Sequence, residues 1–179
     1  MNEEINNYSP QLFMRRKELL TPPSIEVPKG YTVRHFIPGD EVAWERIIED
    51  SFNWKMGFDD IIRNDKYFQE ENVLFICYDN IPIATATAKY NPEYGDNTGY
   101  VHMVGVHSLQ KGKGLGLLIS LAVLHRMFEE GRQDAVLQTD DFRIPAIKTY
   151  LNLGFVHEII HENQEQRWND IFRKLRVNK

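Results

Sequence analysis

The sequence predicts an α/β domain in which one sheet contains strands running in both directions. Three observations support this class. Short runs rich in β-branched and aromatic residues recur along the chain, two of them are joined by the hairpin pair Asp79-Asn80, and two later runs lead directly into helical patterns. A chain of 179 residues is long enough to bury one core of this kind.

After residue 30, the first half of the chain alternates between strand and helix patterns. Strands are expected where β-branched and aromatic residues cluster between turn residues, over 31–37, 72–78, 81–90 and 100–106. Helices are expected where apolar residues recur at helical spacing, over 40–52 and more weakly over 58–69. The apolar stripe of the first helix is predicted to contain Val42, Ile47, Ile48 and Phe52.

The second half begins with a helix that is apolar on more than one face. It is expected from residue 115 to the stop at Gly131, and its composition predicts that it is heavily buried. A strand over 134–140 follows, and then a helix that Pro145 starts and Gly154 ends. Residues 155–177 are predicted to close the sheet with a pair of strands.

Prolines and a glycine within residues 21–30 make the one break in composition along the chain. We therefore divide the chain into an N-terminal arm, residues 1–30, and a main domain, residues 31–179. Within the arm, residues 12–20 fit either an extra strand or a short helix, because their period does not decide between the two.

Charge and composition exclude several classes of protein. The net charge is −5 and the sequence pI is about 5.7, so no global electrostatic attraction favours nucleic acid or an anionic membrane. The first residues have neither the basic start nor the apolar core of a signal peptide, and no apolar stretch is long enough for a membrane span. The single Cys77 lies in an apolar run, where a buried thiol is expected and no internal disulfide can form. We expect a cytoplasmic protein.

Three glycines at alternate positions, Gly112, Gly114 and Gly116, separate the strand at 100–106 from the long helix. Glycine costs about 1 kcal/mol relative to alanine inside a helix, so their presence needs a reason. One reason is a tight turn that lets the helix pack close to the sheet. The other is an anion site, in which free backbone N–H groups at a helix start bind a phosphate, and the interleaved Lys111 and Lys113 favour it.

Two common nucleotide-binding motifs do not fit this turn. It lacks the GK[ST] ending of a Walker loop, and Leu117 stands where a dinucleotide fingerprint has its third glycine. Residues 111–116, Lys-Gly-Lys-Gly-Leu-Gly, instead resemble the phosphate-binding turn of the GCN5-related N-acetyltransferase (GNAT) family, [Q/R]-x-x-G-x-[G/A], with Lys in the first position. Residues 140–155 resemble a second segment of that family, in which Ala146, Tyr150, Gly154 and Phe155 match and Arg143 replaces the usual Asn.

The resemblance implies a GNAT fold, with a mixed, mostly antiparallel sheet flanked by helices. In this family the strands that correspond to residues 100–106 and 134–140 splay apart to admit acetyl-CoA, the co-substrate. Backbone groups near Val104 and Val106 would then bind the pantetheine arm, and an N–H near Val104 would meet the oxyanion. The diphosphate would lie on Lys111, Gly112, Lys113, Gly114, Leu115 and Gly116.

The resemblance also implies an acyltransferase that moves an acetyl group to a primary amine by direct attack, with no metal ion. Tyr150 would be the general acid that protonates the CoA thiolate, since a phenol is protonated at neutral pH. Simple packing of Tyr150 on Leu151 and Phe155 is the alternative role. The general base is left open among a water chain and four side chains: His102, His107, Asp140 and Asp141.

The acceptor is expected to be a small-molecule or peptide amine. The region that resembles the acceptor side of the family contains Trp44, Phe52, Trp54 and Phe58. Aromatic residues at such spacing usually belong to a core, and if some of them line a pocket, a hydrophobic or aromatic amine is favoured. Residues 90–100 form a loop that is expected near the same cleft. A homodimer is left open.

Two further functions compete with the acetyltransferase. One is an acyl-CoA sensor without turnover, which would not need a positioned acid at Tyr150. The other is a zinc hydrolase, because His157-Glu158-Ile-Ile-His161 matches the H-E-x-x-H pattern, which requires a helix. A strand is the expected structure there, although Trp168, Ile171, Phe172 and Leu175 further along have helical spacing.

Overall fold

The computed structural model describes residues 10–177 of the chain. Its strands are β1 (Leu12–Arg16), β2 (Tyr31–His35), β3 (Val73–Tyr78), β4 (Ile81–Tyr90), β5 (Thr98–Val106), β6 (Asp134–Thr139) and β7 (Val156–Glu158). Its helices are α1 (Glu41–Phe52), α2 (Leu115–Glu129), α3 (Ile144–Asn152) and α4 (Gln164–Val177). The weaker helix expected over 58–69 is one π-helical turn, Asp59–Arg63.

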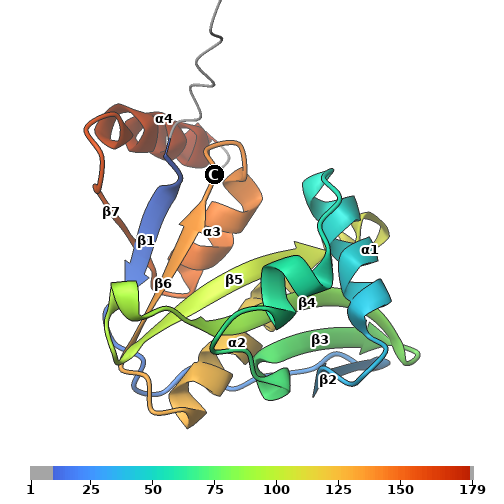
Figure 1. Cartoon of the computed structure of the whole chain (residues 1–179). Helices are drawn as coiled ribbons and strands as arrows, with labels where there is room; N and C mark the ends of the chain where they lie inside the picture. The colour runs from blue at the N-terminus through green and yellow to red at the C-terminus, as the bar shows by residue number, and fades with distance from the viewer. Residues whose placement is uncertain (1–9, 178–179) are drawn as a thin grey trace, which may run out of the picture.

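These strands form one seven-stranded sheet in the order β2-β3-β4-β5-β6-β1-β7 (Figure 1). The pair β5–β6 is parallel, and the other pairs are antiparallel. Asp79 and Asn80 join β3 to β4 with φ values of 48° and 65°, the left-handed backbone that a tight hairpin needs. The predicted mixed, mostly antiparallel sheet is therefore confirmed.

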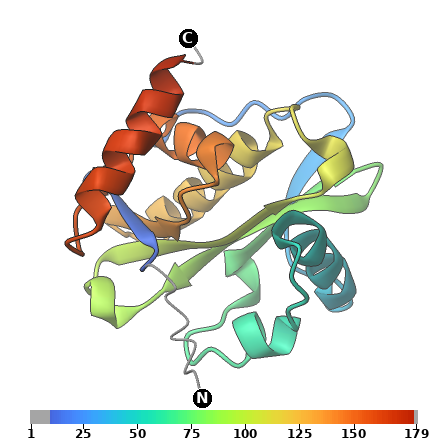
Figure 2. The same ribbon diagram turned by 90° about the horizontal axis from the view of Figure 1, so that it is seen from above.

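The helices cover both faces of the sheet. Helix α1 packs on one face, and α2, α3 and α4 cover the other (Figure 2). As predicted, α2 is buried on several faces, because it lies against β3, β4 and β5 and also contacts α3. No helix in residues 10–177 combines the length and the hydropathy needed to span a membrane.

The predicted apolar stripe of α1 is partly wrong. Trp44, Ile47 and Ile48 form the buried face, whereas Val42 is 74% exposed. Residues two apart on a helix lie about 200° apart around its axis, so the face that buries Trp44 turns Val42 toward solvent. The indole of Trp44 packs edge-on against Phe58 in the smaller of two core clusters, which also contains the predicted buried thiol of Cys77.

The segment that we set apart as an arm shares the sheet and the core. Residues 12–16 form β1, which pairs with β6 on one side and with β7 on the other. Leu12 and Met14 are completely buried. Farther along the segment, the N–H of Leu19 donates to the carbonyl of Gln133 (2.8 Å), so the contact continues beyond the strand.

The predicted closing pair of strands is wrong after residue 158, because α4 follows the short β7. The helical spacing at the C-terminal end decides the structure: Trp168 and Ile171 are 1% exposed on the buried face of α4. The ring of His157 on β7 lies 5.1 Å from the rings of both Trp168 and Phe172. This helix therefore packs against β7 from one face of the sheet, where a second strand was expected to extend the edge.

Candidate active site

Strands β5 and β6 separate after a short stretch of pairing. Their register runs from Thr98–Asp134 to Val101–Leu137 and then stops, although β5 continues to Val106. On its other side β5 remains paired with β4 as far as Val106–Ala84. Within residues 10–177, the edge of β5 beyond Val101 that faces β6 therefore has no strand partner, and the predicted splaying is confirmed.

An irregularity in β5 accompanies the separation. Met103 has a φ of 52°, and the β4–β5 register shifts between Thr85 and Thr87. A bulge of this kind bends a strand and increases its twist. Beyond the bulge, the N–H of His107 donates to the carbonyl of Ile83 on β4 (2.9 Å). Because amide direction alternates along a strand, the backbone groups of Val104 and Val106 point to the opposite, free edge.

A cleft of about 800 Å³ occupies the opening between the two strands. Its lining includes Val104 and Val106 from β5, the turn before α2, and one face of α3. The predicted site residues in the lining are Val104, Val106, Lys111, Gly112, Gly114, Leu115, Gly116 and Tyr150. Lys113 is the exception: it is exposed, and its Nζ donates to Oε1 of Gln110 (2.7 Å).

The glycine turn has the backbone of an anion site. Gly112 and Gly114 have φ values of +79° and +75°, and no atom lies within 4 Å of the place where either would carry a Cβ. Gly114 occupies the N-cap position of α2, and no side chain in the described part of the chain caps this helix start. The first N–H groups of α2 therefore lack a side-chain partner and point into an open approach.

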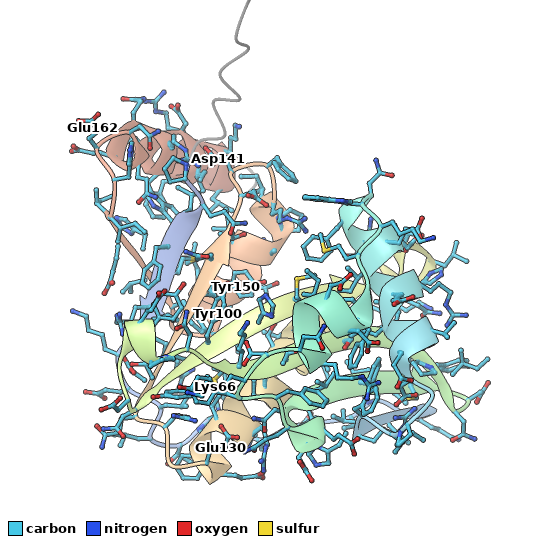
Figure 3. All side chains as sticks on the ribbon, viewed as in Figure 1. Lys66, Tyr100, Glu130, Asp141, Tyr150 and Glu162 are labelled. Atoms are coloured by element: carbon cyan, nitrogen blue, oxygen red, sulfur yellow. The ribbon has the colours of Figure 1, made fainter. Side chains whose placement is uncertain are left out.

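Tyr150 lies on α3, deep in the cleft. Its side chain is 7% exposed, and its ring packs 6.1 Å from the ring of Phe155, so the packing role and the cleft position apply together. Its hydroxyl makes no hydrogen bond with any other residue in the described range 10–177. Burial raises the pKa of Tyr150 to about 12, so the phenol keeps its proton at neutral pH. Tyr100 of β5 also lines the cleft and lies close enough for its own pKa to respond to Tyr150 (Figure 3).

Two of the four side chains considered as bases line the cleft. His102 is partly buried, and this burial, helped by the charge of Lys89, lowers its pKa to about 3. Its Nδ1 has no hydrogen-bond partner in the described part of the chain. The other, Asp140, accepts a hydrogen bond from Nε2 of Gln11 (3.2 Å) and forms an ion pair with Arg143.

The remaining two candidates are engaged outside the lining. Nδ1 of His107 accepts a hydrogen bond from the N–H of Leu109 (3.3 Å). This hydrogen bond caps the short 3-10 turn, Ser108–Gln110, that precedes the glycines. Asp141 pairs with Arg167 of α4, and this hydrogen-bonded pair lowers the pKa of Asp141. Both residues therefore have structural contacts that account for their positions.

The aromatic residues considered for the acceptor side divide in the same way. Trp44 and Phe58 are completely buried in the core, and Trp54 is 70% exposed outside the cleft. Phe52, at the end of α1, lines the cleft. The loop expected near the cleft contributes Tyr100 to the lining; a ring of the same loop, that of Tyr94, packs 5.2 Å from Tyr100.

Several lining residues were not predicted from the sequence. Ala146 precedes Thr149 by three residues and Tyr150 by four, and this helical spacing, counted from Tyr150 back to Ala146 and on to Thr149, could have identified both. Gln11 immediately precedes β1 and Gln138 belongs to β6, and no local pattern indicates them, because the pairing of β1 with β6 places them in the cleft.

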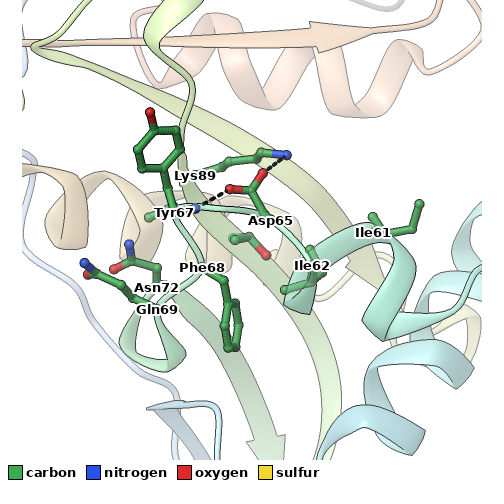
Figure 4. Close-up of a pocket in the computed structure, with 10 residues that line it drawn as sticks. Ile61, Ile62, Asp65, Tyr67, Phe68, Gln69, Asn72 and Lys89 are labelled. Atoms are coloured by element: carbon green, nitrogen blue, oxygen red, sulfur yellow. Dashed lines mark hydrogen bonds and ion pairs between the residues drawn. The ribbon is translucent and has the colours of Figure 1, made fainter.

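A second cavity, of about 20 Å³, lies between β4 and the segment around residues 61–69 (Figure 4). Nζ of Lys89 lies 2.7 Å from Oδ2 of Asp65 at its wall, and Thr87 contributes a buried hydroxyl that has no hydrogen-bond partner among residues 10–177. This volume holds about one water molecule. It is therefore not a substrate site.

The H-E-x-x-H segment does not form the helix that a zinc hydrolase needs. His157 and Glu158 belong to β7, and α4 begins only at Gln164, after His161. The ring of His157 packs against Trp168. The two histidines are not on one helical face, so the zinc interpretation is wrong.

The model of the acetyltransferase (GNAT) family matches residues 40–155. The chain belongs to this family. This GNAT protein is 31% identical over 153 residues to a mycothiol acetyltransferase from Thermomonospora curvata, with 80% of this chain and 50% of the relative covered. A mycothiol acetyltransferase from Nocardia farcinica is 28% identical over 158 residues, with 81% and 52% covered.

Among solved structures, a GCN5-related N-acetyltransferase from Sphaerobacter thermophilus matches with a TM-score of 0.66 and 23% identity, covering 84% of this GNAT protein and 50% of that chain. At this identity the match shows the shared fold. The chain spans about half the length of the curated relatives it matches.

Proposed function

We propose that this GNAT protein is an acetyl-CoA-dependent N-acetyltransferase, in which a primary amine attacks the thioester directly. One observation carries the proposal: the free edge of β5, the glycine turn and the phenol of Tyr150 converge on one cleft. Acetyl-CoA supplies the acetyl group as an activated thioester. Membership of the acetyltransferase family supports the same reaction.

The turn from Lys111 to Gly116 binds the diphosphate in this proposal. The left-handed backbone at Gly112 and Gly114 leaves the first N–H groups of α2 open, and the helix dipole favours negative charge there. Lys111 adds positive charge within the cleft, and Lys113 adds it just outside. The glycines lower helix stability, and in return they give the turn the open backbone that a diphosphate requires.

The free edge of β5 binds the pantetheine arm. The backbone groups of Val104 and Val106 have no strand partner on the side of β6, and an extended chain with amide groups pairs with such an edge as an added strand would. The same arrangement aims the thioester along β5 toward Tyr150. An N–H near Val104 then stabilises the oxyanion that forms when the amine attacks.

Tyr150 donates its phenolic proton to the thiolate as the new amide bond forms. Its raised pKa ensures that the proton is present, and its hydroxyl has no competing partner in the described residues. The amine must lose a proton as well. Of the side chains considered for this role, His102 and Asp140 lie in the cleft, so the proton leaves through one of these or through water.

The test combines binding with turnover. Calorimetry measures the binding of CoA, and a panel of small-molecule and peptide amines is incubated with acetyl-CoA while free thiol and acetylated amine are quantified. The panel includes the non-acetylated precursor of mycothiol, since that is the acceptor to which the names of the relatives point. We expect CoA to bind and thiol to appear in step with one acetylated amine. Binding without turnover of any amine would favour the sensor, and absence of CoA binding would overturn both functions.

A further inference from the structure

Arg143 lies in the wall of the cleft and is held from two sides. Its guanidinium carbon lies 4.0 Å from the centre of the Phe52 ring, which comes from the end of α1. Its Nε donates to Oδ2 of Asp140 (3.1 Å), whose Oδ1 accepts from Gln11. Phe52 from the end of α1, together with Asp140, which Gln11 in turn holds, therefore fixes the position of this side chain, which is 21% exposed.

The two terminal nitrogens of this guanidinium are free of protein partners within residues 10–177. The Nε contact to Asp140 is the one hydrogen bond that its side chain makes there. A guanidinium carries five N–H donors in a planar fork, and four of them belong to the terminal nitrogens. Arg143 is thus a cation that is oriented and partly desolvated, with most of its donors still available at the lining of the cleft.

Arg143 is the N-cap residue of α3, and this position places it at the reacting end of the cleft. Arg143, Ala146 and Tyr150 follow one another at helical spacing, and all three line the cleft. The charge of Arg143 acts on the phenol of Tyr150, where it opposes the effect of burial on the pKa. A rise of about 1.5 Å per residue separates the two backbone positions by about 10 Å, a distance that a small acceptor molecule can span.

We infer that Arg143, anchored by Phe52 and Asp140, forms a carboxylate-binding subsite, and that the acceptor amine of this enzyme carries a carboxylate. The inference rests on the proposed function. A carboxylate matches the planar fork with two parallel hydrogen bonds and brings one negative charge. A phosphomonoester brings nearly two negative charges and would lie beside the carboxylate of Asp140, so the pair favours the singly charged group.

Matched acceptors test this directly. Each of the common L-amino acids is compared with its own carboxamide. O-phosphoethanolamine, an amine that carries a phosphomonoester, is the phosphate arm of the experiment. Acetyl-CoA is held constant, and kcat/KM is calculated for the free-base amine, because an amide lowers the pKa of the neighbouring ammonium group. We expect at least one amino acid to exceed its carboxamide by about tenfold or more, as expected for a hydrogen bond between charged groups.

Two variants assign the effect to the guanidinium. Arg143→Gln should bring the ratio of acid to carboxamide close to one while the KM for acetyl-CoA changes little. Arg143→Lys keeps the charge but loses the planar fork of donors, so its ratio of acid to carboxamide should lie between those of the wild type and Arg143→Gln. Lys148→Gln is the matched control, since it removes a positive charge from an exposed position of the same helix and should leave the ratio unchanged.

Binding provides a second readout that does not require turnover. N-acetylated amino acids and their carboxamides are titrated into the protein–CoA complex by calorimetry. Preferential binding of an acid that Arg143→Gln abolishes supports the subsite. The inference is overturned if acids and carboxamides bind and react equally, if the phosphate arm is preferred, if no acid binds to the CoA complex, or if Arg143→Gln raises the KM for acetyl-CoA instead. Failure of CoA itself to bind would be a failure of the proposed function.

Discussion

Val101 of β5 and Leu137 of β6 are the last two residues that pair these strands. Beyond them β5 turns at Met103 and stays with β4, while β6 follows β1. This divergence produces both the free backbone edge and the cleft that Tyr150 lines. The chemistry proposed for the site depends on this one separation.

Replacing Tyr150 with Phe should slow acetyl transfer without loss of CoA affinity. The change removes the proposed proton donor and keeps the ring that packs on Phe155. Positioned general acids contribute about 10²–10⁴-fold, so we expect kcat to fall by at least about 100-fold. Steady-state kinetics give kcat, and calorimetry gives the affinity for CoA. A kcat equal to that of the wild type would remove Tyr150 from the mechanism.

The pH dependence of the rate should show no early decline on the alkaline side. A phenol acts as an acid only while it is protonated, and Tyr150, with a pKa of about 12, remains protonated well above neutral pH. We expect kcat/KM to rise as the acceptor amine loses its proton and then to stay level up to about pH 10. A descending limb centred below pH 9 in the wild type, absent from Tyr150→Phe, would show that the phenol loses its proton much earlier.

The left-handed backbone at Gly114 predicts a defect specific to the cofactor. An alanine at a φ of +75° costs about 1–2 kcal/mol, so Gly114→Ala should lower the free energy of unfolding by this amount and weaken CoA binding. Gly131→Ala is the control, because Gly131 has a φ of +77° with equally open surroundings, at the other end of α2. It should destabilise the fold to a similar extent and leave the CoA affinity intact. Equal losses of CoA affinity in both variants would argue against a diphosphate site at the turn.

Burial of His102 should make the fold sensitive to acid. Its pKa is about 3 in the folded protein and about 6.5 in an unfolded chain. Between these two pH values the imidazole is protonated in the unfolded state and neutral in the folded state. The free energy of unfolding therefore falls as the pH drops from about 6.5 toward 3. Urea titrations at several pH values should show a shallower fall for His102→Gln than for the wild type. Parallel pH profiles would mean that His102 is not held neutral.

Helix α4 should contribute strongly to stability. Trp168 is 1% exposed, and truncation of a buried indole to alanine costs about 3–5 kcal/mol. Lys174 on the same helix is exposed, so Lys174→Ala should change the free energy of unfolding by less than about 0.5 kcal/mol. Urea denaturation measures both. A small effect of Trp168→Ala would show that α4 is dispensable for the core.

Local patterns were sufficient wherever they coincide with the final packing. The hairpin at Asp79 and Asn80, the buried helix α2 and the stop at Gly131 follow from turn chemistry and periodicity, and the structure has each of them. The glycine turn could be located for the same reason, since the penalty of glycine is visible in the sequence itself. The resemblance to a family added the splaying of the two strands, which no local pattern indicates.

The differences arise where tertiary contacts decide. Residues 12–16 have no clear period, and they become an interior strand because β6 and β7 offer edges on both sides. The strand after Phe155 ends at Glu158. The later residues form a helix instead, because a helix buries the apolar face around Trp168 against the sheet. In the sequence, Arg143 is only a departure from the family motif. Its role as a wall of the cleft depends on the fold, which places its guanidinium carbon 4.0 Å from the centre of the Phe52 ring.

A crystal structure of the protein with acetyl-CoA tests the central claim most directly. We predict that the diphosphate lies on the backbone N–H groups between Lys111 and Gly116, that the pantetheine arm follows Val104 and Val106, and that the sulfur lies within reach of the Tyr150 hydroxyl. A diphosphate bound elsewhere, or a thioester remote from Tyr150, would contradict the account.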